Sequence, residues 1–243
     1  MPIPSMPTRR TALLLAMVIS LSACAVMPSP SVRPGGSVAI VVAADGIDID
    51  LSRARMTGLL EKAGADAGKP AFVPVSVVSL SLGEAVLTGI GDEFAVHGAL
   101  SPTSREQLLS MPVPVDRALL VRLVRNDTEL LEPRSEPALG ADGRRLDDRD
   151  MVVLSQRRLM RVSAVLIDLQ TGAPRWQRAW DAGPVSSLRY VNYSGSSLAA
   201  SVAATLANTV VSGLQGPSAP PAVGELETLQ ALFAEVMGAL PER

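Results

Sequence analysis

The chain alternates between short apolar runs and segments in which apolar residues recur at helical spacing. Residues 38–44 are nearly all apolar and β-branched, which predicts a central strand buried on both faces. Further strands are predicted at residues 72–82, 118–124, 152–169 and 175–180. Helices are predicted at residues 51–65, 101–111, 196–214 and 225–240. This order predicts the α/β class, with a single mixed β-sheet and helices packed on it.

Local signals mark the ends of several predicted helices. Ser52 or Asp50 can cap the helix at residues 51–65, and Ser101 followed by Pro102 is a typical cap and first turn. The helix at residues 225–240 has apolar residues at spacings of three and four, as an amphipathic helix requires. Residues 83–100 stay unassigned, because four glycines interrupt a helical pattern and each costs about 1 kcal/mol inside a helix.

Residues 161–181 have the pattern of a β-hairpin with its turn at residues 170–174. Gly172 supplies the positive φ that such turns require. Trp176, Arg178 and Trp180 share one face of the second arm. We expect the two indole rings to cover the sheet while Arg178 reaches past them to water.

Two polar or proline-rich stretches interrupt the pattern. Residues 126–150 combine Arg, Asp and Glu with proline and glycine, so we expect an exposed loop. Residues 216–224 contain three prolines and predict a linker. We therefore expect an α/β domain at residues 37–215 that includes the polar loop, followed at residues 216–243 by the linker and the C-terminal helix.

The first residues have the layout of a secretory signal peptide. Arg9 and Arg10 precede an apolar run at residues 12–19, which is shorter than the roughly 20 residues that span a bilayer. Residues 21–24, Leu-Ser-Ala-Cys, follow directly and resemble the bacterial lipobox. The alternative is an ordinary signal peptide followed by an incidental cysteine.

The lipobox resemblance implies that residues 1–23 are cleaved and that Cys24 is lipidated. Several acyl chains such as palmitate on one residue give stable anchoring, because each buried methylene contributes about 0.8 kcal/mol. Residues 24–36 then form a flexible tether rich in Pro, Ser and Gly. Ala25 stands where an Asp would favour the inner membrane, which implies a periplasm-facing protein of the outer membrane.

Composition narrows the candidate chemistry. A net charge of -2 leaves no basic excess for a nucleic-acid partner. Cys24 is the only cysteine, so neither an intramolecular disulfide nor a multi-cysteine zinc site can form. The aspartates at 142, 147, 148 and 150 lack calcium-loop spacing, and the glycine motifs near residues 64–70 and 89–94 do not complete a nucleotide-binding pattern. We expect no metal and no cofactor.

His97 is the only histidine, so a Ser-His-Asp triad would have to use it. No G-x-S-x-G motif accompanies it. We expect no catalytic residue, and an envelope hydrolase that uses His97 is an alternative.

The runs at residues 115–123 and 165–172, followed by Trp176, look like a pattern found in envelope proteins. They are similar to the superfamily of curli-secretion lipoproteins, lipoprotein activators of penicillin-binding proteins and the amino-terminal domain of TolB. Asp168, Thr171, Gly172 and Trp176 match its hairpin signature. The resemblance implies a TolB-like fold and a role in binding or assembly rather than catalysis.

We therefore expect an outer-membrane lipoprotein that contacts the membrane through Cys24 and binds a protein partner in the envelope. A curli-like secretion-channel subunit is an alternative, and the oligomeric state stays open. Residues 196–214 are long enough to cross a membrane, but six polar residues along one side favour a packed surface helix.

Overall fold

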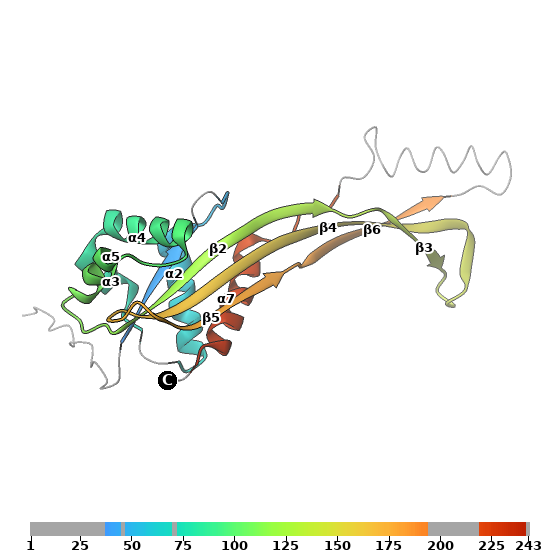
Figure 1. Ribbon diagram of the computed structural model, residues 1–243. Coiled ribbons are helices and arrows are strands. Elements are labelled where there is room, and N and C mark those ends of the chain that lie inside the picture. Colours follow the sequence, from blue (N-terminus) through green and yellow to red (C-terminus); the bar gives the residue numbers. More distant parts are fainter. Residues whose placement is uncertain (1–36, 45–46, 70–71, 194–218, 242–243) are drawn as a thin grey trace, which may run out of the picture. The chain divides into compact units, whose positions relative to one another are not determined.

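A computed structural model describes residues 37–44, 47–69, 72–193 and 219–241, all within the compact unit Gly35–Arg243. Its strands form one open mixed sheet with helices packed on it, which confirms the predicted fold class (Figure 1). The strands are β1 (Val38–Ala43), β2 (Arg117–Leu130), β3 (Arg134–Leu139), β4 (Arg145–Asp168), β5 (Pro174–Ala182) and β6 (Val185–Tyr193). The helices are α2 (Arg53–Asp66), α3 (Val75–Leu82), α4 (Glu84–His97), α5 (Pro102–Leu109) and α7 (Glu225–Ala239). The predicted signal peptide, Cys24, the tether and the helix predicted at residues 196–214 lie outside the described residues.

All six residues of β1 are buried, as predicted for a strand covered on both faces. β1 pairs in parallel with β2, from Val38 opposite Arg117 to Ala43 opposite Arg122. The prediction of a central strand is wrong, because on its other side the described sheet offers only a single bridge from Val38 to Phe72. Helices α2, α3 and α4 contact β1, and they bury it without a second neighbouring strand.

β4 is the strand around which the sheet is organised. It has 24 residues and pairs in antiparallel fashion with four other strands. Along one edge, β2 pairs with residues 156–168 and β3 with residues 145–153. Along the other edge, β5 pairs with residues 160–167 and β6 with residues 149–157. One continuous strand therefore joins the helix-covered part of the sheet to the part that carries β3 and β6.

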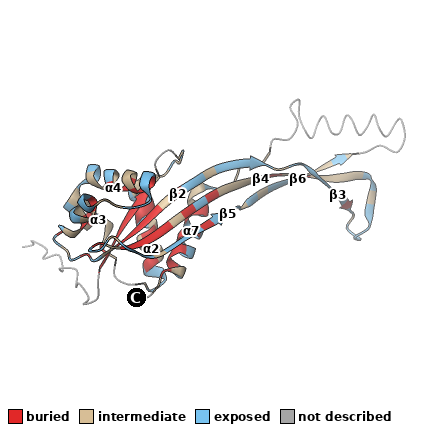
Figure 2. Ribbon diagram, viewed as in Figure 1, coloured by how far each residue is buried: buried red, intermediate tan, exposed pale blue. Residues whose placement is uncertain are grey.

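Two hydrophobic clusters lie on opposite faces of the sheet. One contains Val162 and Leu166 of β4 and is covered by α2 and α7, while the other contains Val165 and Ile167 and is covered by α3, α4 and α5. Alternate side chains of a strand point to opposite faces, so neighbouring β4 residues enter different clusters. Buried residues are concentrated where these helices overlie the strands (Figure 2).

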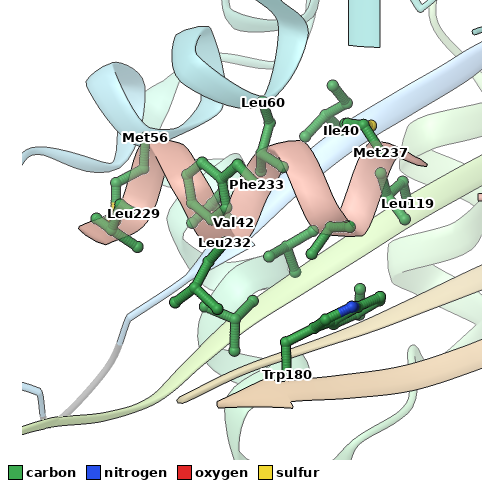
Figure 3. Close-up of a cluster of buried hydrophobic side chains, with 14 of the residues drawn as sticks. Ile40, Val42, Met56, Leu60, Leu119, Trp180, Leu229, Leu232, Phe233 and Met237 are labelled. Atoms are coloured by element: carbon green, nitrogen blue, oxygen red, sulfur yellow. The ribbon is translucent and has the colours of Figure 1, made fainter. Parts of the chain in front are cut away.

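The expected C-terminal helix is α7, and it forms one wall of the first cluster. Figure 3 shows Leu232, Phe233 and Met237 of α7 beside Ile40, Val42 and Leu119 of the sheet. Leu229 and Val236 are also fully buried there. Burying a large apolar side chain contributes about 1.5–3 kcal/mol, so α7 is a major part of the core.

Residues 72–82 do not form the predicted strand. Phe72 makes one bridge to β1, and α3 then starts after Pro74, which is its N-cap residue. The helix buries Val78 in the second cluster, and the Ser81 hydroxyl donates to the carbonyl of Val77 one turn earlier. Burial of one helical side outweighs the local β preference of the Val and Ser residues.

The unassigned stretch forms α4, and its glycines have separate local roles. Gly83 (φ +79°) and Gly98 (φ +67°) stand at the two ends of the helix, where a positive φ is needed. Within the helix, Gly91 lies against β1, and a Cβ there would be 3.0 Å from the carbonyl oxygen of Val42. The missing side chain allows α4 to approach the sheet.

The prediction of a loop at residues 126–150 is wrong, although most of these residues are exposed. β2 continues to Leu130, β3 spans Arg134–Leu139 and β4 begins at Arg145 after a turn at Gly143. The pattern also misses β6. These strands pair with one another without burying a wholly apolar face, so their sequences lack the simple alternation that identifies half-buried strands.

The predicted β4–β5 hairpin is confirmed. Gly172 has φ +74°, and its N–H donates to the carbonyl of Asp168 at 2.7 Å. The ring centroids of Trp176 and Trp180 are 5.6 Å apart, and both rings pack on the cluster that α7 covers. Arg178 is exposed, and its guanidinium lies 5.7 Å from the Trp180 ring centroid.

Gly172→Val should destabilise the domain by about 2 kcal/mol or more. A left-handed backbone costs about 1–2 kcal/mol for a residue with a Cβ, and a β-branched side chain adds crowding. A Cβ at this position would also lie 2.9 Å from the guanidinium carbon of Arg105, which is held by the carbonyls of Leu169 and Gln170. Thermal unfolding measures the effect.

The matched control is Gly89→Ala in α4. Nothing lies within 4 Å of a Cβ at that helical position, so this change should stabilise the protein by up to about 1 kcal/mol. An unchanged melting temperature in Gly172→Val would contradict the assigned turn.

Candidate functional site

One part of the sheet extends beyond both hydrophobic clusters. It consists of β3, β6, residues 124–130 of β2 and residues 145–157 of β4, and we call it the distal sheet. On β4 the clusters end at Met160, and on β2 they end at Leu123. The register of β2 against β4 shifts between Leu123 and Arg125, at the point where the distal sheet begins. A bulge there increases the local twist and redirects the strand.

One face of the distal sheet carries charged side chains in pairs, and we call it the charged face. Arg189 of β6 lies 3.8 Å from Glu136 of β3, and Arg157 of β4 lies 4.0 Å from Glu129 of β2. Exposed pairs of this kind contribute about 0–1 kcal/mol each, so their main effect is to keep the face soluble.

The strand-end residue Tyr193 of β6 also lies on the charged face. Arg149 of β4 stacks on it, with its guanidinium 5.0 Å from the ring centroid. Hydrogen bonds from Arg149 lower the pKa of the Asp148 carboxyl, and the same pairing raises the pKa of Arg149. Both groups stay charged throughout the physiological range.

The opposite face carries an apolar stripe, and we call it the apolar face. Cross-strand pairs between β4 and β6 place Leu154 beside Leu188 and Val152 beside Tyr190. On the other edge of β4, Leu130 of β2 lies opposite Gln156, on the same face as Leu154. Leu188 is 40% exposed and Leu130 is 64% exposed. Leu130 and Leu188 lie on the two strands that flank β4, and exposed aliphatic side chains that form a continuous patch are typical of a contact surface for another macromolecule.

A hydrogen-bonded group joins the distal sheet to α7. Arg158 of β4 donates to the carbonyl of Val223, to the Asn126 side chain and to Glu225, at 2.5, 2.7 and 3.3 Å. Asn126 donates to Glu225 and to the carbonyl of Asp48, both at 2.7 Å. The side chains of Arg158 and Glu225 are only 13% and 19% exposed. Each of the two charges depends on the other, because an unpaired charge at such a site is costly.

Among the described residues, no group of three His, Cys, Asp or Glu side chains could hold a metal ion. The aspartates of the β3–β4 hairpin have arginine neighbours instead. Asp148 lies 2.6 Å from Arg149, and Asp150 lies 3.6 Å from Arg145. The chemistry of this hairpin is therefore that of paired surface charges.

His97 lies exposed at the end of α4, near Glu93. Glu93 accepts hydrogen bonds from the Ser101 N–H, at 2.6 Å, and from the Ser104 hydroxyl. Burial alone raises the pKa of Glu93, but the hydrogen bonds from Ser104 and Ser101 outweigh it and the net pKa is lowered. Because Ser104 donates to the carboxylate and not to His97, these residues do not have the order of a catalytic triad.

Cys24, the predicted lipidation site, lies outside the described residues. Within the described part of the chain, no single helix has the length and apolar character of a membrane span. Only α3 and α4 taken together meet that criterion, and they are bent by 102° at their junction.

The signature residues of the hairpin are structural. The Asp168 carboxylate binds the Arg175 guanidinium at 2.6 Å and the N–H groups of Gln170 and Thr171 at 3.1 and 3.0 Å. The hydrogen bond from Arg175, followed by that from the Thr171 N–H, holds the pKa of Asp168 at about 2. Asp168 therefore closes the turn as an anion at neutral pH.

Asp168→Asn should lower the melting temperature most at neutral pH. The pKa of Asp168 is lower in the folded protein, about 2, than the value of about 3.9 for an unfolded chain. The stabilisation is therefore present above pH about 4 and is lost as the pH falls through about 2. The difference between wild type and variant should shrink over that interval in thermal melts. Arg175→Gln should reproduce the profile, and a difference independent of pH would contradict the role of the carboxylate.

No protein-family model matches the chain, and no curated protein matches it in sequence. Several solved structures are similar at low identity. Hypothetical protein CT253 from Chlamydia trachomatis is 14% identical, with 84% of this chain and 96% of that chain covered and a TM-score of 0.38. Lipoprotein GNA1162 from Neisseria meningitidis is 17% identical, with 72% of this chain and 98% of that chain covered and a TM-score of 0.30. The LpoB C-terminal domain from Salmonella enterica is 15% identical, with 70% of this chain and 93% of that chain covered and a TM-score of 0.29. These TM-scores assign neither a family nor a function.

Proposed function

We propose that this protein is a lipoprotein of the outer membrane that faces the periplasm and acts as a binding or assembly component of the cell envelope. In this proposal, residues 1–23 are the signal peptide and Cys24 carries the acyl chains. The distal sheet is the surface that contacts the protein partner. The observation that carries the binding role is the apolar face, where exposed Leu130 and Leu188 lie on strands held in place by β4.

The anchor is supported by the lipobox-like residues 21–24 and by the 12 residues, 25–36, that follow before the described domain begins. A chain of that length reaches at most about 40 Å when fully extended. The folded domain can then lie up to this distance from the membrane while the protein stays attached.

A binding role is supported by the kind of side chains that the surface offers. The charged face includes the ion pairs of Arg157 with Glu129 and Arg189 with Glu136, and the apolar face includes the pairs of Leu154 with Leu188 and Val152 with Tyr190. Neither face gathers a nucleophile, a base and an oxyanion donor, which catalysis of acyl transfer requires. Contact with another macromolecule is the chemistry that both faces support.

Cys24→Ala should abolish lipidation. Wild-type protein in its bacterial host should take up a palmitate analogue and fractionate with the outer membrane, because acyl chains on Cys24 hold it there. The matched control is Ala25→Asp, which keeps the cysteine and should keep the label while moving the protein to the inner-membrane fraction. Label on the Cys24→Ala protein would refute the anchor.

A photocrosslinking residue placed on the distal sheet should capture the partner in intact cells. We expect adducts when p-benzoylphenylalanine replaces Leu188 or Leu130. No adduct is expected at Leu80, which is 87% exposed but lies in α3, the helix that packs beside β1, α2 and α4. Equal adducts at all three positions, or adducts only at Leu80, would contradict the assignment of the distal sheet.

A further inference from the structure

The outer edge of β6 has hydrogen-bonding groups whose direction follows from the strand register. The Arg158 N–H donates to the carbonyl of Pro184 at 3.0 Å, in the same register as the pairs between β4 and β6. Hydrogen-bonded pairs alternate along an antiparallel ladder. Residues 186, 188, 190 and 192 therefore direct their N–H and C=O groups toward β4. Residues 185, 187, 189, 191 and 193 direct theirs away from it.

A second contact gives the same result. The carbonyl of Ser155 in β4 accepts from the N–H of Leu131, on the β2 side, at 2.9 Å. Ser155 therefore points its backbone groups away from β6, and its cross-strand partner Ser187 has no ladder hydrogen bond with it. Within the described sheet, β6 pairs with β4 alone, so the outward groups of residues 185, 187, 189 and 191 have no strand partner there.

β6 also differs from the other edges in charge. Natural sheet edges are protected by charged residues, prolines or bulges. Residues 124–130 of β2 include Arg125, Asp127 and Glu129, β3 contains Pro137 among its charged residues, and β5 carries Arg175, Arg178 and Asp181. β6 reads Val-Ser-Ser-Leu-Arg-Tyr-Val-Asn-Tyr, with Arg189 as its only charge and no proline. It is therefore the least protected of these edges.

We propose that the outer edge of β6 receives an extended strand from a protein partner, which adds to the sheet in antiparallel fashion. This inference rests on the proposed binding function and specifies its mode. The main chain of the incoming strand pairs with residues 185, 187, 189 and 191. Its alternate side chains lie on the two faces of the distal sheet, with apolar residues beside Leu188 and Tyr190.

The charge at the centre of β6 selects the partner. Arg189 is 67% exposed at its side chain and reaches across β4 to Glu136 at 3.8 Å, a long ion pair. An acidic residue directly opposite Arg189 in the incoming strand makes a closer pair. The partner segment is therefore an extended stretch of β-branched and apolar residues with one acidic residue at its centre.

A second copy of this chain fits the edge poorly. Full antiparallel overlap of two β6 strands has its centre at residue 189, because β6 runs from Val185 to Tyr193. That register places Arg189 opposite Arg189, and like charges in direct opposition destabilise a strand pair. Shifted registers avoid the clash but form fewer hydrogen bonds. A different protein with an acidic residue at this place satisfies both requirements.

The test uses the purified full-length lipoprotein in lipid nanodiscs and two synthetic peptides. The first peptide is Thr-Val-Thr-Val-Glu-Val-Thr-Val-Thr, and the second has Lys in place of the Glu. NMR-resolved amide exchange should show slow exchange at residues 186, 188 and 190 and fast exchange at residues 187, 189 and 191. The Glu peptide should slow amide exchange at residues 187, 189 and 191. It should also bind about fivefold more tightly than the Lys peptide.

Two variants separate backbone pairing from general damage. Val191→Pro removes an outward N–H and leaves the ladder to β4 intact, so it should weaken binding of the Glu peptide by about tenfold. Val191→Thr keeps the N–H and should bind within about twofold of wild type. If Val191→Pro does not fold, Arg189→Glu still decides the matter, because it should reverse the preference between the two peptides.

Several results would overturn the inference. The first is slow amide exchange at residues 187, 189 and 191 in the isolated monomer, which would show that another part of this chain occupies the edge. The second is self-association that Val191→Pro abolishes, which would show that the edge pairs with a second copy of this chain. Failure of both peptides to bind, or an unchanged preference in Arg189→Glu, would also overturn it. Each can occur while Cys24 is lipidated and Leu188 still crosslinks to a partner, so failure of strand addition is distinguishable from failure of the proposed function.

Discussion

The unbroken pairing of β4 is the constraint on which the rest of the structure depends. Within the described sheet, four strands pair with it, and β1 is attached indirectly, through β2. Because side chains alternate along a strand, the residues that enter the core at one end determine which side chains face water at the other. Met160, Val162 and Leu166 belong to the cluster beneath α7, so Leu154 further along must lie on the same face. The apolar face thus continues the core beyond the last covering helix. A proline within β4 would remove ladder hydrogen bonds and disconnect the distal sheet from the part that stabilises it.

The group around Arg158 lies where the helices end and the distal sheet begins. It joins β4, β2, the start of α7 and the segment after Ala44 through Glu225, Asn126 and the carbonyl of Asp48. Glu225 is in the first turn of α7, where a negative charge is favoured by the helix dipole. Most of the stabilisation of the fold is hydrophobic, but hydrophobic contact is not directional. The directed hydrogen bonds of Arg158 fix the orientation of α7 relative to the strands, and so they set how far the helix covers the apolar face.

Local signals in the sequence predicted the parts of the fold that are determined locally. Ser52 accepts from the N–H of Arg55 and Ser101 from the N–H of Ser104, as their capping patterns indicate, and Gly172 has the predicted positive φ. The failures have a common cause, which is that tertiary contacts decided the outcome. Val78 lies in a helix that buries it in the second cluster, and Gly91 is tolerated because β1 approaches it. Residues of β3 and the outer part of β2 are polar on an exposed sheet, so no periodicity distinguished them from a loop. The candidate site could not be predicted from the sequence for the same reason. Whether β6 is an edge strand depends on which strands pair beside it in the folded sheet.

Register joins the fold of β6 to its proposed binding. The same alternation that directs the backbone of residues 186, 188, 190 and 192 into the β4 ladder leaves the intervening residues open. A slip of β6 by one residue would exchange the two sets and would also move Leu188 and Tyr190 to the charged face. The apolar pairing of Leu188 with Leu154 opposes that slip. The slip would leave Leu154 without its apolar neighbour and would place Leu188 beside the ion pairs. Leu188 and Leu154 therefore have two roles. They form part of the apolar face, and they hold β6 in the register that directs the backbone groups of residues 187, 189 and 191 outward, where a partner strand can pair with them.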